Sequence, residues 1–232
     1  MESYLYSYLI GNVTLIVVWF ILFFWRKDTR KMMLTISALF GIAGLIVDPI
    51  YSSDWWFPKT LTGTMPGIES FLFGFTVAGI TSVAYTELFS KKLRNRKSKK
   101  KKKDKKDINL LVIALLTTVL FFGSYFILGW NSFYSSFPAL LIPTAFIYFK
   151  RKDLILESLT SALLLTIISF IFYRIPELIT PGWINSAWNF NMISGVTLFM
   201  VPVEDLIWFF MAGLLIGPLY EYWQDKKLVD KR

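Results

Sequence analysis

The sequence predicts an all-α, polytopic membrane protein with seven transmembrane helices, arranged as two parallel three-helix repeats joined by a connector helix. Of the 232 residues, 55% are hydrophobic and the mean hydropathy is +0.52, which is too apolar for a soluble domain of this size. Seven segments approach the roughly 20 residues that cross a bilayer core about 30 Å thick. Two short motifs also recur in the two halves of the chain, as an internal repeat requires.

Each expected helix is an apolar run bounded by charged or turn-forming residues. In order, the runs cover residues 4–25, 33–51, 67–89, 109–129, 134–149, 154–174 and 199–221. The first run has neither a basic region before it nor a small-residue cleavage site after it, which are the marks of a signal peptide. We therefore expect it to be retained as a helix.

The basic residues predict the orientation of the chain. Of the 25 Lys and Arg residues, 23 lie in the segments after the first, third, fifth and seventh runs, and only Lys59 and Arg174 fall on the other side. Cytoplasmic loops of membrane proteins carry the excess of Lys and Arg. We expect an outer amino terminus and a cytoplasmic carboxyl terminus.

Residues 91–107 form a lysine-rich segment with 12 Lys and Arg residues between Lys91 and Lys106. We expect an unstructured cytoplasmic loop attracted to anionic lipid, at about 1 kcal/mol for each basic residue near the surface. Clustered lysines can also bind nucleic acid, but no aromatic residue is interleaved here to stack on bases. We therefore expect a lipid partner and no nucleic acid.

Two recurring motifs define the repeats. An Arg-Lys-Asp triplet follows the first run at residues 26–28 and the fifth run at residues 151–153, an offset of 125. Glu69 and Glu204 open the third and seventh runs at an offset of 135. Three helices plus one connector restore the chain direction, so the repeats should be parallel and both glutamates should lie near the outer face. The expected units are residues 1–90, 91–107, 108–130 and 131–232.

The composition limits the chemistry that the chain can perform. It contains no cysteine and no histidine, so disulfides, thiolate catalysis, cysteine or histidine metal sites and imidazole acid-base catalysis are excluded. There is no glycine-rich dinucleotide loop either. We expect no cofactor and no metal. Any reaction must use carboxylates, hydroxyls or aromatic rings.

The segments between the second and third runs and between the sixth and seventh runs share a pattern. In each, a Trp-x-aromatic sequence, at Trp55 and at Trp188, is followed by a glycine and then by the glutamate motif. The second motif, residues 202–205, reads Pro-Val-Glu-Asp and opens a Phe-rich helix. The first departs from it, since Gly67 follows the proline and Ser70 replaces the second acid.

This pattern, present once in each three-helix repeat, resembles the membrane-integral lycopene cyclases of the bacterial and archaeal heterodimeric or fused type. The resemblance covers most of the chain outside the lysine-rich segment and the connector, and it implies the fused form. It also implies a prokaryotic cell membrane and a lipid-soluble carotenoid substrate. Oligomeric state is left open.

The expected reaction converts an acyclic lycopene-type end group to a ring. A proton adds to the terminal double bond, the resulting carbocation closes the ring, and a different proton leaves. No atom is oxidised, so neither a flavin nor a nicotinamide is required. An acid, a base and walls that stabilise a cation are sufficient.

The candidate catalytic residues are Glu204, Glu69 and Asp205. A carboxyl in an apolar layer favours the neutral form that can donate a proton, whereas the dipole at a helix start favours the anion. We expect Glu204 to be the principal donor with Glu69 assisting. Asp205 could form an acid-base pair with Glu204, or it could serve chiefly as a helix cap.

Aromatic side chains near these acids are the candidate substrate-binding residues. At helical spacing, Trp208 shares a face with Glu204 and Phe73 shares one with Glu69, and ring faces attract cations by about 0.5 to 2 kcal/mol. These rings could instead face lipid as an interfacial belt. The full set expected at the site is Trp208, Phe73, Trp188, Trp55 and Asp48.

Other acidic residues have simpler explanations. Glu87, Glu157 and Glu221 fall at the cytoplasmic ends of their runs, where we expect them at the interface. Glu177 could pair with Arg174.

Three alternative functions compete with cyclisation. A carotenoid-binding or carotenoid-hydrating protein of the same fold fits the same residues. A proton-coupled transporter would also use repeats and acids, although here the acids lie near one face and not at the midplane. A retinal photoreceptor is disfavoured, because the one lysine outside the cytoplasmic segments, Lys59, lies in an outer loop and no helix supplies a Schiff-base amine.

Overall fold

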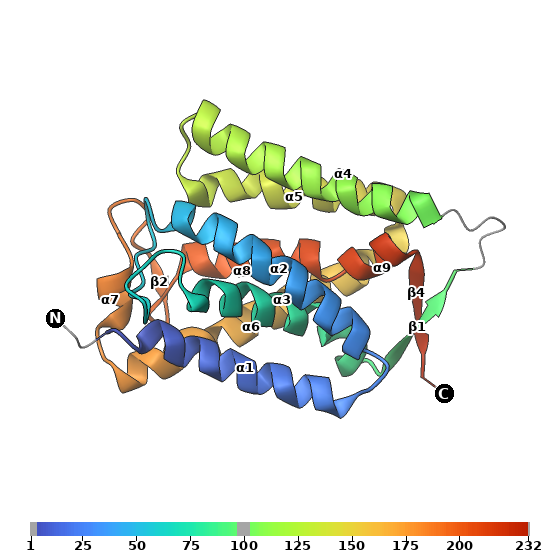
Figure 1. Cartoon of the computed structure of the whole chain (residues 1–232), viewed down its shortest axis with the longest axis horizontal. Helices are drawn as coiled ribbons and strands as arrows, with labels where there is room; N and C mark the ends of the chain where they lie inside the picture. Colours follow the sequence, from blue (N-terminus) through green and yellow to red (C-terminus); the bar gives the residue numbers. More distant parts are fainter. Residues whose placement is uncertain (1–3, 97–102, 232) are drawn as a thin grey trace.

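A computed structural model of the chain describes residues 4–96 and 103–231 (Figure 1). Within these ranges, seven helical segments are long and apolar enough to cross a membrane, which confirms the predicted fold class. They are α1 (Ser7–Trp25), α2 (Arg30–Tyr51), α3 (Ile68–Leu88), α4 (Lys103–Phe122) with a π-helical turn (Gly123–Ile127), α5 (Ser132–Lys150), α6 (Ile155–Ile179), and the broken pair α8 (Val203–Ile216) and α9 (Leu219–Gln224). The protein is an integral membrane protein.

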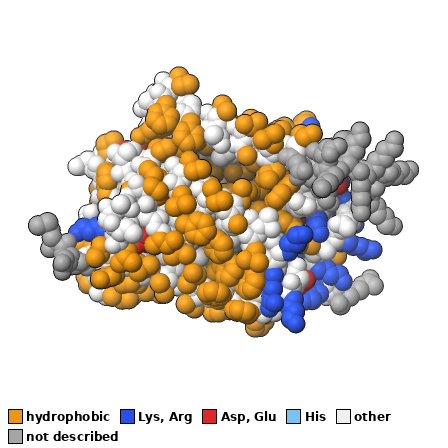
Figure 2. All heavy atoms as spheres, in the orientation of Figure 1, with side chains coloured by type: hydrophobic (Ala, Val, Ile, Leu, Met, Phe, Trp, Pro, Cys, Tyr) orange, Lys and Arg blue, Asp and Glu red, His pale blue; other side chains and the backbone are white. Residues whose placement is uncertain are grey.

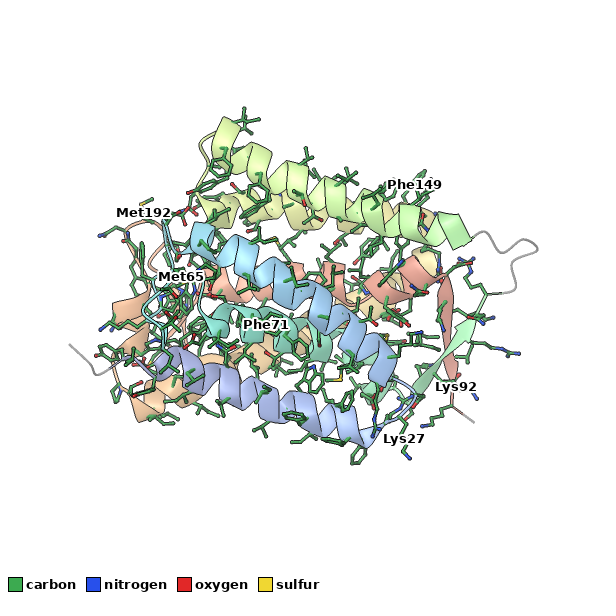
Figure 3. All side chains as sticks on the ribbon, viewed as in Figure 1. Lys27, Met65, Phe71, Lys92, Phe149 and Met192 are labelled. Carbon is green, nitrogen blue, oxygen red and sulfur yellow. The ribbon has the colours of Figure 1, made fainter. Side chains whose placement is uncertain are left out.

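The two ends of the bundle differ in charge. Lys and Arg side chains gather at the end where strands β1 (Lys91–Asn95) and β4 (Lys226–Asp230) lie, which we call the basic end (Figure 2). The opposite end, the loop end, holds residues 52–67 and 180–202. Met65 and Met192 mark these two loops, and Lys27 and Lys92 mark the basic end (Figure 3). The first turns of α3 and α8 are both at the loop end, so Glu69 and Glu204 lie at one face as predicted.

Several helix limits differ from those expected. Helix α6 continues to Ile179 and not only to 174, and its last turn contains Pro176, whose carbonyl accepts a hydrogen bond from the Thr180 N–H at 2.7 Å. The seventh span begins at Val203 and not at 199, because residues 197–202 form a hairpin of β2 (Thr197–Leu198) and β3 (Val201–Pro202). A short helix, α7 (Trp183–Ala187), lies in the loop before this hairpin.

The break between α8 and α9 leaves one carbonyl without its helical partner. Pro218 has no N–H group, so it cannot donate to the carbonyl of Leu214 four residues earlier. The hydroxyl of Ser158 on α6 donates to that carbonyl instead, at 2.6 Å. An unsatisfied carbonyl in the apolar layer is costly, and Ser158 therefore stabilises the broken helix.

Equivalent helices can be paired by the two offsets. With an offset of 125, α1 corresponds to α5 and α2 to the first 22 residues of α6. With an offset of 135, α3 corresponds to α8 and α9 together. The boundaries expected for the four sequence units stay a prediction. Contacts at the two ends of the bundle relate the same helices to one another.

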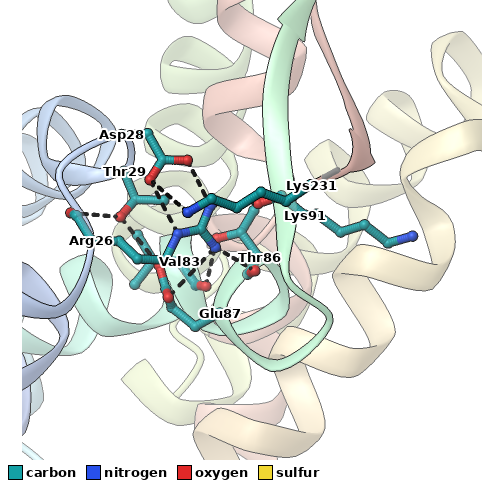
Figure 4. Close-up of polar contacts among 8 residues, drawn as sticks. All are labelled: Arg26, Asp28, Thr29, Val83, Thr86, Glu87, Lys91 and Lys231. Atoms are coloured by element: carbon teal, nitrogen blue, oxygen red, sulfur yellow. Dashed lines mark hydrogen bonds and ion pairs between the residues drawn. The ribbon is translucent and has the colours of Figure 1, made fainter.

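At the basic end, the recurring arginine makes the same contacts in both halves. Arg26 is buried and donates to the carbonyls of Thr86 at 2.8 Å and Lys91 at 2.6 Å, and it forms an ion pair with Asp28 (Figure 4). Glu87 approaches the same guanidinium at 3.5 Å. The Arg-Lys-Asp triplet at residues 26–28 therefore joins the end of α1 to the end of α3.

Arg151 repeats this arrangement in the second half. It donates to the carbonyls of Glu221 at 3.5 Å and Lys226 at 2.7 Å, and it forms an ion pair with Asp153. Each of these partners lies at the repeat offset from its counterpart around Arg26. The two Arg-Lys-Asp triplets therefore form the same set of contacts in both halves of the protein.

Two antiparallel backbone contacts join the halves. At the basic end, β1 pairs with β4, and the pairing is centred on Leu93 and Leu228, which are equivalent residues. The expectation of an unstructured segment is thus wrong for Lys91–Asn95, because these residues find a strand partner in the chain's own carboxyl-terminal segment. It is also wrong for residues 103–107, since α4 begins at Lys103 and not at 108. Residues 97–102 of that segment lie outside the described residues.

The second backbone contact lies at the loop end. Trp56 and Trp188 form an antiparallel bridge, in which Phe57 N–H donates to the Ala187 carbonyl at 2.6 Å and Asn189 N–H donates to the Trp55 carbonyl at 2.9 Å. The two bonds are related to each other by a twofold rotation. The two bridges therefore place a pseudo-twofold axis along the length of the bundle.

The ion pair of Asp28 should make stability depend on pH. The Arg26 guanidinium holds the pKa of Asp28 below its ordinary value of 3.8. This contribution is present above pH 3.8 and is lost as the pH falls through the lower pKa of the folded state. We expect Asp28→Asn to lower the melting temperature at pH 7 and the difference from wild type to shrink below pH 4. Thermal unfolding in detergent measures this, and a difference that persists unchanged at pH 3 would contradict it.

Candidate functional site

The two recurring glutamates hold the loops. Glu69 is fully buried, and its Oε1 accepts a hydrogen bond from the Leu61 N–H at 2.8 Å. Glu204 is 4% exposed, and its Oε1 accepts from the Ser194 N–H at 2.7 Å. In both, the second oxygen is buried without a hydrogen-bond partner among the described residues. Each glutamate therefore joins the first turn of its helix to the preceding loop.

Two aspartates occupy a different position. Asp48 and Asp205 both line a narrow chamber of about 40 Å³ at the loop end of the bundle. Asp205 Oδ1 accepts a hydrogen bond from the Tyr173 hydroxyl at 2.6 Å. Asp205 Oδ2 has no hydrogen-bond partner among the described residues, so Asp205 does not cap α8, which was one of its two expected roles. Asp205 faces α6 and the chamber instead of its own backbone.

Asp48 has its own hydroxyl and indole partners. The Tyr8 hydroxyl lies 3.5 Å from Asp48 Oδ2, and the side chains of Trp56 and Ser70 also interact with this carboxyl. Asp48 was expected at the site from its depth alone, and the structure places it there.

The first glutamate motif has Ser70 where the second motif has Asp205, and the structure explains this difference. At the repeat offsets, Ser70 is equivalent to Asp205, and Asp48 is equivalent to Tyr173. Each half therefore sets a carboxyl against a hydroxyl across two neighbouring helices, but the two groups have exchanged places. The chamber keeps one carboxyl from each half although only one motif has a second acid.

The chamber walls are aromatic. Trp55, Phe73 and Trp208, three of the four aromatic residues expected at the site, line it. The fourth, Trp188, does not line it but lies beside Asp205 and packs on Trp56 with ring centroids 4.1 Å apart. The remaining walls come from Tyr51, Trp56, Phe172, Tyr173 and Phe209, which were not expected at the site.

Trp208 and Trp55 are held by hydrogen bonds and are not simply an interfacial belt. Trp208 Nε1 donates to the Tyr51 hydroxyl at 2.9 Å, and Trp55 Nε1 donates to the Ser132 hydroxyl at 2.9 Å. Ser132 in turn donates from its N–H and its hydroxyl to Asp54, at 2.7 and 2.6 Å. Half-burial raises the pKa of Asp54. These bonds fix the indole orientations at the chamber.

A larger cavity of about 300 Å³ lies next to the chamber. Asp48, Tyr51, Phe73 and Trp208 line both spaces, so the two spaces adjoin each other. The cavity lies between α2, α3, α4, α5 and α8, and most of its wall is apolar. Its volume is at the lower end of the range for ligand sites. The arrangement suits a long apolar molecule whose end reaches two carboxyls.

Tyr8 and Tyr173 lie at the site, although the sequence motifs did not indicate them. Both lie within apolar runs of the sequence and are buried in the structure. A hydroxyl in such a run needs a hydrogen-bond partner, so a tyrosine at this position is a usable signal. The 125-residue offset also maps Asp48 onto Tyr173. Applying that offset to the acidic residues within the spans finds Tyr173 but not Tyr8, whose equivalent is Phe133.

Other buried acids depart from expectation as well. Glu157 and Glu221 are 3% and 0% exposed and interact with each other near the basic end, so the expectation that they lie at the interface is wrong. Glu177 does not pair with Arg174. Its carboxylate accepts from the N–H groups of Gly182 at 2.7 Å and Ile184 at 2.9 Å, which orders the start of α7.

The fold and site define an integral membrane protein with an apolar cavity that ends in an aromatic, carboxylate-containing chamber. Residues 131–223 match the family model described as lycopene cyclase. This match confirms the resemblance for the second repeat, which contributes Tyr173, Asp205 and Trp208 to the chamber, and it supports a carotenoid cyclase function. A search of curated proteins and a search of solved structures gave no match.

The loop-holding role of the glutamates predicts a difference between two substitutions. Glu204→Gln keeps an oxygen that can accept from the Ser194 N–H, whereas Glu204→Ala leaves that N–H unsatisfied. We expect Glu204→Ala to cost about 1–3 kcal/mol of stability and Glu204→Gln to cost much less. Unfolding by denaturing detergent measures both, with Glu69→Ala and Glu69→Gln as the matched pair. Equal losses for Ala and Gln would contradict the role.

Proposed function

We propose that the protein cyclises the end group of an acyclic, lycopene-type carotene by a proton-initiated, redox-neutral reaction. The observation that carries the proposal is the placement of Asp48 and Asp205 in an aromatic chamber at one end of an apolar cavity. A polyene end group is apolar, and its cation needs aromatic faces and an acid-base pair. The match to the lycopene cyclase family over residues 131–223 supports the same conclusion.

The surroundings of the two aspartates suggest different roles. Asp205 Oδ2 is buried without a hydrogen-bond partner among the described residues, so a proton on it can be directed at the substrate. Asp48 faces three groups that can donate hydrogen bonds, Tyr8, Trp56 and Ser70, whereas Asp205 faces two, Tyr173 and Trp188; such groups stabilise a carboxylate. We assign Asp205 as the acid that protonates the terminal double bond. Asp48 is the base that accepts the proton lost after ring closure.

The number of protons and electrons balances in this scheme. Asp205 loses one proton to the CH carbon of the terminal double bond, which leaves a tertiary cation on the neighbouring carbon. A nearby double bond donates its electron pair to this cation and closes the ring, and Asp48 removes one proton to form the product double bond. Phe73 and Trp208 line both spaces and would face the cation, which ring faces stabilise by about 0.5 to 2 kcal/mol. No electron acceptor or donor takes part.

The two glutamates, Glu69 and Glu204, have a secondary role in the reaction. Glu204 adjoins Asp205 in sequence and interacts with it electrostatically, and Glu69 interacts in the same way with Asp48. Both can assist proton return through their second oxygens. This order of importance is the reverse of the one expected from the sequence, where Glu204 is the principal donor.

We also propose an orientation for the protein in the membrane. The basic end would face the cytoplasm, with its lysines near anionic lipid, and the loop end would face outward. The carotene would remain in the bilayer with only its end group in the protein.

Hydration of the carotene is the second candidate function. The chamber of about 40 Å³ has room for a water molecule, since a buried water needs a cavity of about 10–15 Å³. A water at the cation would give a hydroxylated, uncyclised end. Product analysis separates the two functions directly.

The redox-neutral mechanism predicts activity without any added cofactor. Purified protein in lipid with lycopene alone should give cyclised product, and reaction in deuterium oxide should place deuterium in the new ring, because the added proton comes from an exchangeable carboxyl. Chromatography and mass spectrometry measure both. A strict requirement for reduced flavin, a ring without deuterium, or only hydroxylated product would overturn the proposal.

The acid assignment predicts an order among four variants. Asp205→Asn and Asp48→Asn keep size but cannot exchange a carboxyl proton, so cyclisation should fall by about 100-fold or more. Glu204→Gln and Glu69→Gln keep the loop bonds and should lose less. The measurement is product per folded protein in a lycopene-producing host. Greater loss in Glu204→Gln than in Asp205→Asn would return the donor role to Glu204.

A further inference from the structure

The pseudo-twofold relation is broken in the middle of the bundle. Helices α1 and α6 pack closely, and the equivalent pair, α5 and α2, barely touch. The cavity of about 300 Å³ occupies the space between α2 and α5, with residues of α4 on its wall. One of two equivalent interfaces is therefore closed and the other is open.

Phe172 and Gly11 pack together in the closed interface, and their equivalents on the open side differ from them in size. Phe172 on α6 is fully buried and packs against α1 at Gly11, where a Cβ atom would come within 2.7 Å of the Phe172 ring. The residues equivalent to this pair on the open side are Val47 and Ser136, and both line the cavity. Where the closed interface has a benzyl group, the open one has an isopropyl group and an empty space.

The connector helix lies only on the open side. Helix α4 packs along α5 at the edge of the bundle opposite α1 (Figure 1), and Thr117, Thr118, Phe121 and Phe122 contribute to the cavity wall. Ile46 on α2 also lines the cavity and is 56% exposed, and Thr118 is exposed as well. These residues place the mouth of the cavity between α2 and α4, facing the lipid.

We propose that Val47 is a specificity-determining residue that keeps the α2/α5 interface open for one end of an acyclic carotene, and that Phe172 closes the equivalent interface between α1 and α6. The chain then has one lateral opening and takes one carotene end at a time, with the rest of the polyene outside in the bilayer between α2 and α4. This inference rests on the proposed function for the identity of the ligand. It adds the route and the residues that control it.

The test measures lycopene retained by purified protein in lipid nanodiscs, separately from cyclisation. Val47→Phe gives the open side the side chain of the closed side, and it should reduce retained lycopene by about tenfold or more, because a filled cavity cannot take the end group. Ile42→Phe is the matched control, since Ile42 lies on the same helix, is 57% exposed and does not line the cavity. It should bind as wild type does.

A second pair of variants tests the side of access without filling the interior. Ile46 and Ile171 are equivalent residues, exposed by 56% and 39%. Ile46→Trp should narrow the mouth and reduce lycopene retention, and Ile171→Trp on the closed side should not. Normal retention by Val47→Phe, or a greater loss in Ile171→Trp than in Ile46→Trp, would overturn the inference.

The two proposals fail in distinguishable ways. Asp205→Asn should retain lycopene without cyclising it, because Asp205 lines the chamber and not the larger cavity. Wild-type protein that retains lycopene, loses it in Val47→Phe and never cyclises it would overturn the function and support the opening. Cyclisation by wild type that is unaffected in Val47→Phe would support the function and overturn the opening.

Discussion

The antiparallel contact between Trp56 and Trp188 is the interaction on which the site depends. It joins the two loops by two backbone hydrogen bonds and packs two indoles together at a tilt of 56°, with ring centroids 4.1 Å apart. One indole interacts with Asp48 and the other lies beside Asp205, so the bridge sets the positions of both carboxyls. Glu69 and Glu204 serve the same end by fixing each loop to its own helix.

The symmetry is preserved where charge and backbone groups must be satisfied and is lost where a ligand must fit. At the basic end, Arg26 and Arg151 make matching bonds to carbonyls, because a buried guanidinium needs its partners in either half. In the apolar middle no such requirement exists. There the equivalent residues Val47 and Phe172 differ in size, and the interface with the smaller side chain is the open one.

The chamber shows how a repeat can keep two acids while its motifs diverge. A carboxyl and a hydroxyl face each other across neighbouring helices in both halves, with Asp205 opposite Tyr173 in one and Asp48 near Ser70 in the other. Exchange of the two groups leaves the local polarity unchanged. It does change which helix carries the acid, and this is consistent with different roles for the two carboxyls in one reaction.

The sequence by itself determined the membrane class, the seven spans, the repeat offsets and the clustering of acids at one end, because hydropathy, charge and spacing are local properties. It also indicated Trp55, Phe73, Trp208 and Asp48 as wall residues. It did not decide which acid faces the chamber. Trp208 lies four residues after Glu204 and three after Asp205, and both spacings put side chains on one helix face. Only the rotation of α8 against α6, set by tertiary packing, turned Asp205 toward Tyr173 and Glu204 toward the loop. The pairing of β1 with β4 and the open α2/α5 interface likewise arise from contacts between distant segments, which no local pattern contains.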